Sequence, residues 1–473
     1  MDDFYDQFDR VLRAGFKYGI QAVPLRSDVE RPFTGVAHFK KFTAACHRGF
    51  EKAQHTVLEM LKANAIASSL SAYERRRREL LLRKVIDGII FTMLRQQTYV
   101  TRRISLHDDP PNLDFKVIDK AMAIVDQLNS EDRLTFAALA DLSTFVHICD
   151  VVRIDRRSGG HGISFIELKE GRVNAIVAKH LEKYAATPEA LDEIKVDQEI
   201  APEHRKQAQR MQKQRIRFRQ TAEVLRNDVG TDIKSNLPIR MNHQPIDEVH
   251  YYKQFNDAAI AALASGTSSI TVNYCLHIGM ASGADMKSRI RQARIAAVYG
   301  MSQTASKAEA GLKSYYQKVQ DMGIKADEAF KLTNLLHSHL MCVPASPLFT
   351  WGVSQETIDA IVRDQLSVYC VLDLPAMMFA IDQAGLIPHL STKAEAEECS
   401  AFGLGPPPRF GGRVLKIRHP KLPGEEILLG GAFSRFINNL HCPYHYFLTT
   451  EEHWSEVLGH EGVPPSGGAS SVN

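Results

Sequence analysis

The sequence predicts an α/β fold in which a small β-sheet is flanked by long helices. Residues 40–66 and 71–104 contain no proline and space their apolar side chains at helical intervals. Residues 147–174 instead hold two apolar runs around a glycine-rich turn, which is typical of a β-hairpin. The β-branched and aromatic segment 268–280 predicts a further strand. These segments together favour an α/β protein over an all-helical one.

The length of the chain predicts more than one domain. Its 473 residues exceed the roughly 250 to 300 at which single hydrophobic cores stop growing. We expect a helical N-terminal region over 1–68, a core over 69–280, a mostly helical domain of unknown role over 281–459, and a disordered tail over 460–473.

Composition limits the class of protein. The formal net charge of +3 is too small to indicate a partner by itself. No apolar run approaches the roughly 20 residues that span a bilayer, and the acidic N-terminus does not resemble a targeting signal. The seven cysteines form no CxxC pair, so a disulfide framework is not expected. We therefore expect a cytoplasmic protein without membrane contact.

The remaining elements follow from local patterns. A short helix is expected around 115–128 and another around 172–185. A long helix over 201–227 should begin at Pro202, because proline is favoured in the first helical turn. Two short strands are expected around 414–430. The apolar middle of the helix over 71–104 predicts that this helix is largely buried.

The hairpin carries charges inside its apolar runs. Asp150 lies in the first run, and Glu167 and Lys169 lie in the second. If Ser158 and Gly159 form the centre of the turn, paired positions sum to 317 and Asp150 lies directly opposite Glu167. Lys169 is two residues beyond Glu167 and therefore shares its face. Two carboxylates and an amine are thus expected on one patch.

This group of side chains suggests a metal site. Neighbouring carboxylates repel one another, and either a raised pKa or a bound cation relieves the repulsion. Oxygen ligands with open positions suit Mg²⁺ or Mn²⁺, and such a metal polarises a phosphoryl oxygen and activates a water. Lys169 would orient that water or stabilise charge in the transition state.

The arrangement resembles the PD-(D/E)xK nuclease superfamily, which places an Asp on one strand and an acid-x-Lys on the next. The resemblance implies a restriction-endonuclease-like α-β-β-β-α-β core with large helical N- and C-terminal additions. It implies that Asp150, Glu167 and Lys169 are catalytic, and that Asp150, Glu167 and the backbone carbonyl of Leu168 bind Mg²⁺ or Mn²⁺. The strand over 268–280 would be the last strand of the core.

The resemblance leaves some positions open. Many members add an acid from the first helix, for which Glu79 is the best candidate and Glu74 the next. Some add a Gln after the acid-x-Lys strand, and Gln207 and Gln209 fit equally well. Cys149 replaces a proline that is frequent in the family but is not required chemically.

A different interpretation of the hairpin remains open. Acid-x-Lys triplets arise by chance, and this sequence has others, among them those that begin at Glu193, Asp232 and Asp285. The hairpin could instead be a sheet edge whose acids face solvent and pair with Lys169 and Arg153. Only the triplet at Glu167 lies in a β-type run preceded by an apolar strand with an Asp.

A basic helix suggests a polyanionic partner. Residues 203–226 contain eight Lys or Arg against two Glu. Such a helix suits sequence-independent contact with phosphates, although a solvated helix face is the simpler alternative. The residues expected to bind nucleic acid are Arg205, Lys206, Arg210, Lys213 and Arg217. A second basic run over 73–80 is open to the same two interpretations.

The leading hypothesis is a metal-dependent nuclease that hydrolyses phosphodiester bonds. The resemblance favours DNA over RNA, with a role in defence against foreign DNA, or alternatively in repair. The competing hypothesis is a non-catalytic nucleic-acid-binding or scaffold protein that retains a nuclease-like core. A mainly helical interaction protein is a third possibility. Each is compatible with a homo-oligomer or with an activating partner.

Overall fold

The structure is a computed structural model of the chain in two compact units. It describes residues 3–18, 36–94, 101, 104, 112–146, 148–155, 162–168, 177, 179, 201–227, 229–231, 238–240, 249–335, 352–399, 408–421, 426–428, 430–438 and 440–459. Unit 1 comprises Met1–Phe8, Pro24–Glu30 and His243–Asn473, and unit 2 comprises Asp9–Val23 and Arg31–Asn242. The first helix, α1 (Asp3–Tyr18), contributes residues to both.

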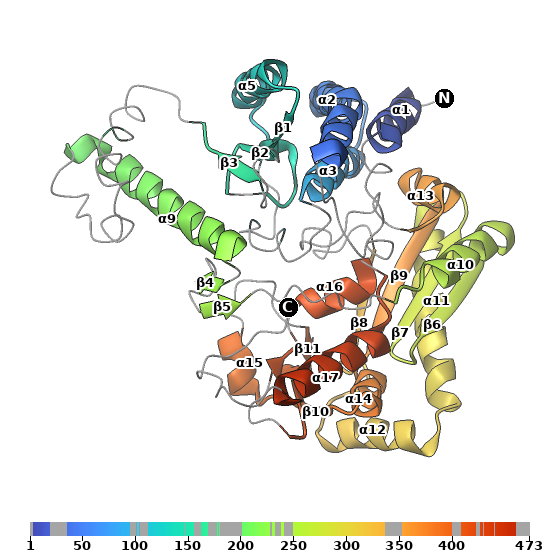
Figure 1. The fold of residues 1–473 in the computed structure, drawn as a ribbon. Coiled ribbons are helices and arrows are strands. Elements are labelled where there is room, and N and C mark those ends of the chain that lie inside the picture. The colour runs from blue at the N-terminus through green and yellow to red at the C-terminus, as the bar shows by residue number, and fades with distance from the viewer. Residues whose placement is uncertain are drawn as a thin grey trace. The chain divides into compact units, whose positions relative to one another are not determined.

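Unit 2 contains the expected hairpin as part of a three-stranded antiparallel sheet (Figure 1). The strand order is β1 (Thr135–Leu139), β2 (Val151–Asp155), β3 (Ile163–Ile166). All five residues of β1 are buried, and Val151, Val152 and Ile154 of β2 are fully buried. The turn around Ser158 and Gly159 lies outside the described residues.

Three predicted helices of unit 2 are confirmed. They are α2 (Val36–Ile66), α3 (Ala72–Met93) and α5 (Phe115–Glu131). The hydroxyl of Ser71 begins α3 by accepting a hydrogen bond from the Glu74 amide. As its apolar sequence predicts, α3 is buried through most of its length.

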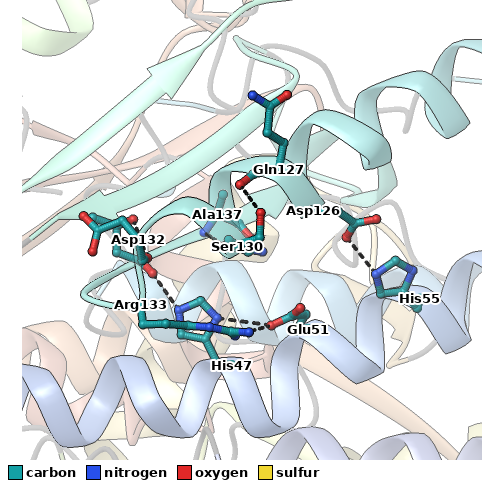
Figure 2. A network of polar contacts seen from close by, with 11 residues as sticks. His47, Glu51, His55, Asp126, Gln127, Ser130, Asp132, Arg133 and Ala137 are labelled. Carbon is teal, nitrogen blue, oxygen red and sulfur yellow. Dashed lines mark hydrogen bonds and ion pairs between the residues drawn. The ribbon is translucent and has the colours of Figure 1, made fainter.

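Polar side chains attach the helices of unit 2 to the first strand. The His47 ring on α2 lies 2.8 Å from the carbonyl of Thr135 and 3.1 Å from Glu51 (Figure 2). The Asn129 side chain on α5 both donates to and accepts from the backbone of Ala137. The Gln54 side chain accepts from the Leu139 amide at 2.8 Å. These contacts satisfy backbone groups of β1 that would otherwise be buried without partners.

The long basic helix is also confirmed. A 3-10 turn (Pro202–His204) leads into α9 (Arg205–Asn227), which is followed by the short pair β4 (Val229–Thr231) and β5 (Pro238–Arg240). The helix expected around 172–185 and the tail over 460–473 fall outside the described residues, except for Val177 and Lys179.

Unit 1 contains a four-stranded antiparallel sheet of order β6-β7-β9-β8. The strands are β6 (Thr267–Val272), β7 (Leu276–Ser282), β8 (Phe330–Asn334) and β9 (Leu366–Asp373). The expectation of one core strand over 268–280 is wrong. Asn273 and Tyr274 adopt positive φ angles of 48° and 62°, so the segment folds into a tight hairpin that belongs to this sheet.

Two helices cover opposite faces of that sheet. Ser268 donates to the Ala258 carbonyl of α10 (Tyr252–Ser265). The neighbouring strand packs so closely on α11 (Met286–Ser306) that a Cβ on Gly279 would lie 2.1 Å from the Ala293 oxygen. Because Ser268 and Gly279 point to opposite faces, the sheet lies between the two helices.

The rest of unit 1 is a mixture of helices and strands rather than mostly helical. Its helices are α12 (Ala310–Asp321), α13 (Gln355–Val362), α14 (Leu374–Gln383), α15 (Lys393–Cys399), α16 (Gly430–Asn438) and α17 (Pro443–Gly459). A second sheet contains β10 (Ile387–Leu390), β11 (Arg409–Phe410), β12 (Arg413–Arg418) and β13 (Glu426–Ile427). This sheet confirms strands around 414–430. Among the described helices of both units, none has the length and apolar content to cross a membrane.

Candidate functional site

The register of the hairpin is the one that the sequence predicts. Val151 pairs with Ile166 and Val152 pairs with Phe165, so paired positions sum to 317. The described pairs end at Val151 and Ile166, so the expected position of Asp150 opposite Glu167 stays a prediction. The Asp150 amide donates to the Ile166 carbonyl at 3.0 Å, an offset of one residue from this register, so the regular pairing ends at Val151. Both carboxylates therefore lie where β2 begins and β3 ends.

Backbone contacts fix Asp150 from both sides. Its carbonyl accepts from the Ala140 amide at 2.7 Å, and its Oδ2 accepts from the Leu168 amide at 2.5 Å. A charge-assisted bond of this length holds the carboxylate toward the end of β3. The amide of Leu168 thus contacts the site, whereas the resemblance implies a role for its carbonyl.

A third carboxylate belongs to this cluster. Asp141 lies in the 3-10 turn (Ala140–Leu142) that follows β1. Burial raises the pKa of Asp141 to about 7, with further increases from the charges of Asp150 and Glu167, while Arg83 acts in the opposite direction. We call Asp141, Asp150 and Glu167 the carboxylate cluster.

The same charges act on a neighbouring thiol. Burial raises the pKa of Cys149 well above its ordinary value, and Asp150, Glu167 and Asp141 raise it further. Cys149 is therefore an inert thiol rather than a nucleophile. Its shift is a second sign that negative charge is concentrated at this end of the sheet.

Charged residues of α3 hold the loop that carries Asp141. The Asp87 carboxylate, fully buried, accepts from the hydroxyls of Ser143 and Thr144 at 2.7 and 2.5 Å and from the Thr144 amide at 2.7 Å. Lys84 donates to both Asp87 and Thr144. Arg83, also fully buried, donates to the Ser143 carbonyl at 2.6 Å. The loop after β1 is thereby fixed to the helix.

The predicted acid of the first helix is engaged elsewhere. Glu79 forms ion pairs with Arg76 at 2.7 Å and with Arg83 at 3.3 Å. Glu74 pairs with Arg78 at 3.1 Å. Arg83 pairs with Glu79 and also acts on Asp141, so it stands between the two acids. The structure does not bring Glu79 itself into the carboxylate cluster.

The basic run over 73–80 is only partly exposed. Arg77 and Arg78 are buried, and Arg75 donates to the Ala67 carbonyl at 3.2 Å. Three of the four guanidinium groups are therefore wholly or partly buried in unit 2, and Arg76 is the exposed cation of this run.

The carboxylate oxygens of the cluster are the type of ligand that a hard divalent cation prefers. Mg²⁺ typically takes one or two carboxylates and completes its shell with water and substrate phosphate. Among the described residues, no set of three or more His, Cys, Asp or Glu is arranged to hold a metal. Lys169 lies outside the described residues. Arg153 on β2 donates to the Thr135 hydroxyl at 3.2 Å.

One face of α9 presents a continuous basic stripe. Lys206, Arg210, Lys213 and Arg217 are all exposed and follow one another at intervals of four, three and four residues. This spacing places them along one side of the helix over about 16 Å. Ala208, Met211, Thr221 and Val224 are buried. Arg205 is half-buried and does not extend the stripe.

Comparison with known proteins adds no relative. This chain matches no family model, no curated protein and no solved structure.

Sequence reasoning missed Asp141. The residue lies in a short turn between β1 and the segment "STFVHICD", and no motif includes it. A carboxylate placed directly after an apolar strand, and before the strand that carries Asp150, was the available signal. Since β1 pairs with β2, its C-terminal end lies beside the beginning of β2, where Asp150 is found.

Proposed function

We propose that this protein is a metal-dependent nuclease, which hydrolyses phosphodiester bonds of nucleic acid, with DNA as the favoured substrate. The observation that supports this most directly is the carboxylate cluster. Asp141, Asp150 and Glu167 lie at the ends of three neighbouring strands of one sheet. Burial raises the pKa of Asp141 to about 7, and the charges of Asp150 and Glu167 raise it further. A bound cation would offset the repulsion among these three carboxylates.

Each residue has a distinct role in this proposal. Asp150 and Glu167 bind the metal, and the Leu168 amide holds Asp150 in position. Mg²⁺ or Mn²⁺ supplies a polarised phosphoryl oxygen and a water of lowered pKa. Lys169, two residues after Glu167, stabilises negative charge that develops on the phosphoryl group. Asp141 adds negative charge that strengthens cation binding.

The basic stripe supports a nucleic-acid substrate. Its four exposed cations follow one another along α9. A phosphate backbone presents negative charges at regular intervals, and such a row of cations can contact them. These contacts carry no sequence information, so they hold the polymer without selecting a site.

A non-catalytic nucleic-acid-binding protein is the second candidate. The basic stripe favours this candidate, because binding of phosphates to the stripe requires none of the residues of the carboxylate cluster. In that case the chain would bind nucleic acid in a salt-dependent manner and would not cleave it.

A cleavage assay separates the two candidates. The full chain is incubated with supercoiled plasmid, linear duplex, single-stranded DNA and RNA, in Mg²⁺, Mn²⁺ or EDTA. We expect metal-dependent cleavage that Asp150→Asn and Lys169→Ala each lower by about 100-fold or more.

Asp155→Asn is the matched control. Asp155 is a half-buried Asp at the far end of β2, five residues along the chain from Asp150. Its variant should cleave like the wild type. Cleavage that survives Asp150→Asn would refute the site, and salt-sensitive binding without cleavage in any metal would favour the second candidate.

A further inference from the structure

The helix α11 in unit 1 carries cations and no acids. Residues 286–308, which contain the whole helix, include five Lys or Arg and no Asp or Glu. The acids that flank this segment are Asp285 and Glu309. Asp285 caps the helix, because its carboxylate accepts a hydrogen bond from the Ser288 amide at 2.7 Å. The segment is therefore a positive element bounded by acids at its ends.

The packing of α11 determines which side faces solvent. Arg289, Ala293, Ala297 and Gly300 are buried against the sheet. The opposite side is exposed, and we call it the α11 outer face. Its principal residues are Lys287, Arg291, Gln292, Ile295, Tyr299 and Ser302.

An aromatic ring stands among these cations. Tyr299 is 59% exposed and Ile295, one turn earlier, is 56% exposed. Lys287 and Arg291 continue the same row at four-residue intervals. Cations and a free aromatic face along one row are the two components of single-strand recognition, since the cations contact phosphates and bases stack on the ring.

Other occupants fit this face less well. A stable protein interface covers about 800 Å² on each partner and has an apolar centre. Ile295 and Tyr299 together are too small for such a centre. A second copy of the chain would bring Lys287 and Arg291 against like charges if the two faces met symmetrically.

We infer that the α11 outer face binds single-stranded nucleic acid. Tyr299 stacks on an unpaired base, and Lys287 and Arg291 contact the adjacent phosphates. A duplex keeps its base faces stacked inside, so it cannot use the Tyr299 ring in this way. The choice of polymer rests on the proposed function, whereas the surface itself is independent of the carboxylate cluster.

The test is fluorescence anisotropy of the full chain in EDTA, which separates binding from cleavage. The probes are a labelled oligo-dT of about 20 nucleotides and an abasic strand of equal length, which keeps the phosphates and lacks the bases. Tyr299→Leu should weaken oligo-dT binding by about fivefold or more and change abasic binding by less than about twofold. Tyr299→Phe keeps the ring and should bind oligo-dT like the wild type.

Charge variants give an independent readout. Lys287→Gln/Arg291→Gln should weaken the binding of both probes and reduce the slope of log affinity against log salt by about 1.4. Lys313→Gln removes an exposed cation from α12 and should change neither slope nor affinity by a comparable amount.

The outcomes separate this inference from the proposed function. If Tyr299→Leu binds both probes like the wild type, the inference is overturned, whatever the cleavage assay gives. A change in sedimentation of Tyr299→Leu with unchanged oligo-dT affinity would overturn it in favour of a second copy. Loss of oligo-dT binding in Tyr299→Leu, in a chain that cleaves nothing, would support this inference and reject the nuclease.

Discussion

At the residue scale, Asp141 responds to two neighbouring charges. Its pKa of about 7 lies above the ordinary value of 3.8, first because of burial and then because of Asp150 and Glu167. A folded carboxyl with a raised pKa binds a proton that the unfolded chain has released. Ionisation of Asp141 therefore opposes folding, and stability is lost as the pH rises from about 4 to about 7.

Asp141→Asn should remove this loss. In EDTA the free energy of unfolding of the variant should equal that of the wild type near pH 4. The variant should become the more stable of the two as the pH rises, by about 1 to 2 kcal/mol at pH 8, after a discount for partial solvent exposure. Urea unfolding at a series of pH values measures this difference. Asp155→Asn serves as the control, and an Asp141→Asn advantage that is constant with pH would contradict the electrostatic cause.

A divalent cation should relieve the same repulsion. Adding Mg²⁺ in place of EDTA at pH 8 should stabilise the wild type by about 1 kcal/mol at a concentration several times its dissociation constant. Asp150→Asn should lose this gain, because one of the two proposed ligands is removed. Equal Mg²⁺ effects on the wild type and the variant, measured as shifts of the urea midpoint, would mean that the cation binds elsewhere.

At the scale of elements, α3 determines where Asp141 lies. Asp87 accepts hydrogen bonds from Ser143, from Thr144 and from Lys84 inside unit 2. Asp87→Ala leaves the Lys84 charge buried without its acid and frees the loop, so we expect a loss of about 3 to 5 kcal/mol. Circular dichroism in urea gives this value, and cleavage should fall with it.

A double variant tests whether the unpaired charge causes the loss. Lys84→Met/Asp87→Leu removes both charges and should recover part of the stability that Asp87→Ala loses. Cleavage should stay low in the double variant, because the loop has lost its contacts to Asp87 in either case. Recovery of full cleavage would show that these contacts do not position Asp141.

The basic stripe makes a prediction about salt. Lys206→Gln/Lys213→Gln should weaken duplex DNA binding and lower the slope of log affinity against log salt by about 1.8. Lys116→Gln/Lys120→Gln is the matched control, since it removes two exposed lysines at helical spacing from α5 of the same unit. Equal slopes for the two variants would show that α9 is a solvated helix face only.

The elements also show what sequence alone could predict. The assumed centre of the glycine-rich turn was sufficient to give the register of β2 and β3, in which Val151 pairs with Ile166. The strand β9 was missed, since almost all its residues are buried and a continuous apolar run does not distinguish a strand from a buried helix. Arg77 and Arg78 look like surface cations in sequence but are buried by tertiary packing.

At the scale of the whole molecule, each unit has a core of its own. In unit 1 the contact between Gly279 and α11 is decisive, because a Cβ there would lie 2.1 Å from the Ala293 oxygen and 2.2 Å from the Ala297 nitrogen. Both are backbone atoms, so α11 would have to shift. Gly279→Ala should destabilise unit 1 by about 1 to 3 kcal/mol.

The tryptophans allow the two units to be followed separately. Trp351 and Trp454 both belong to unit 1, and the chain has no others. Gly279→Ala should therefore lower the urea midpoint that tryptophan fluorescence reports, whereas Gly300→Ala, whose Cβ would meet no atom closer than 3.6 Å, should not. Asp87→Ala should leave the fluorescence midpoint unchanged while an earlier transition emerges in circular dichroism, because domains with separate cores unfold separately. A fluorescence midpoint that falls together with the circular dichroism of Asp87→Ala would instead mean that the two units unfold as one.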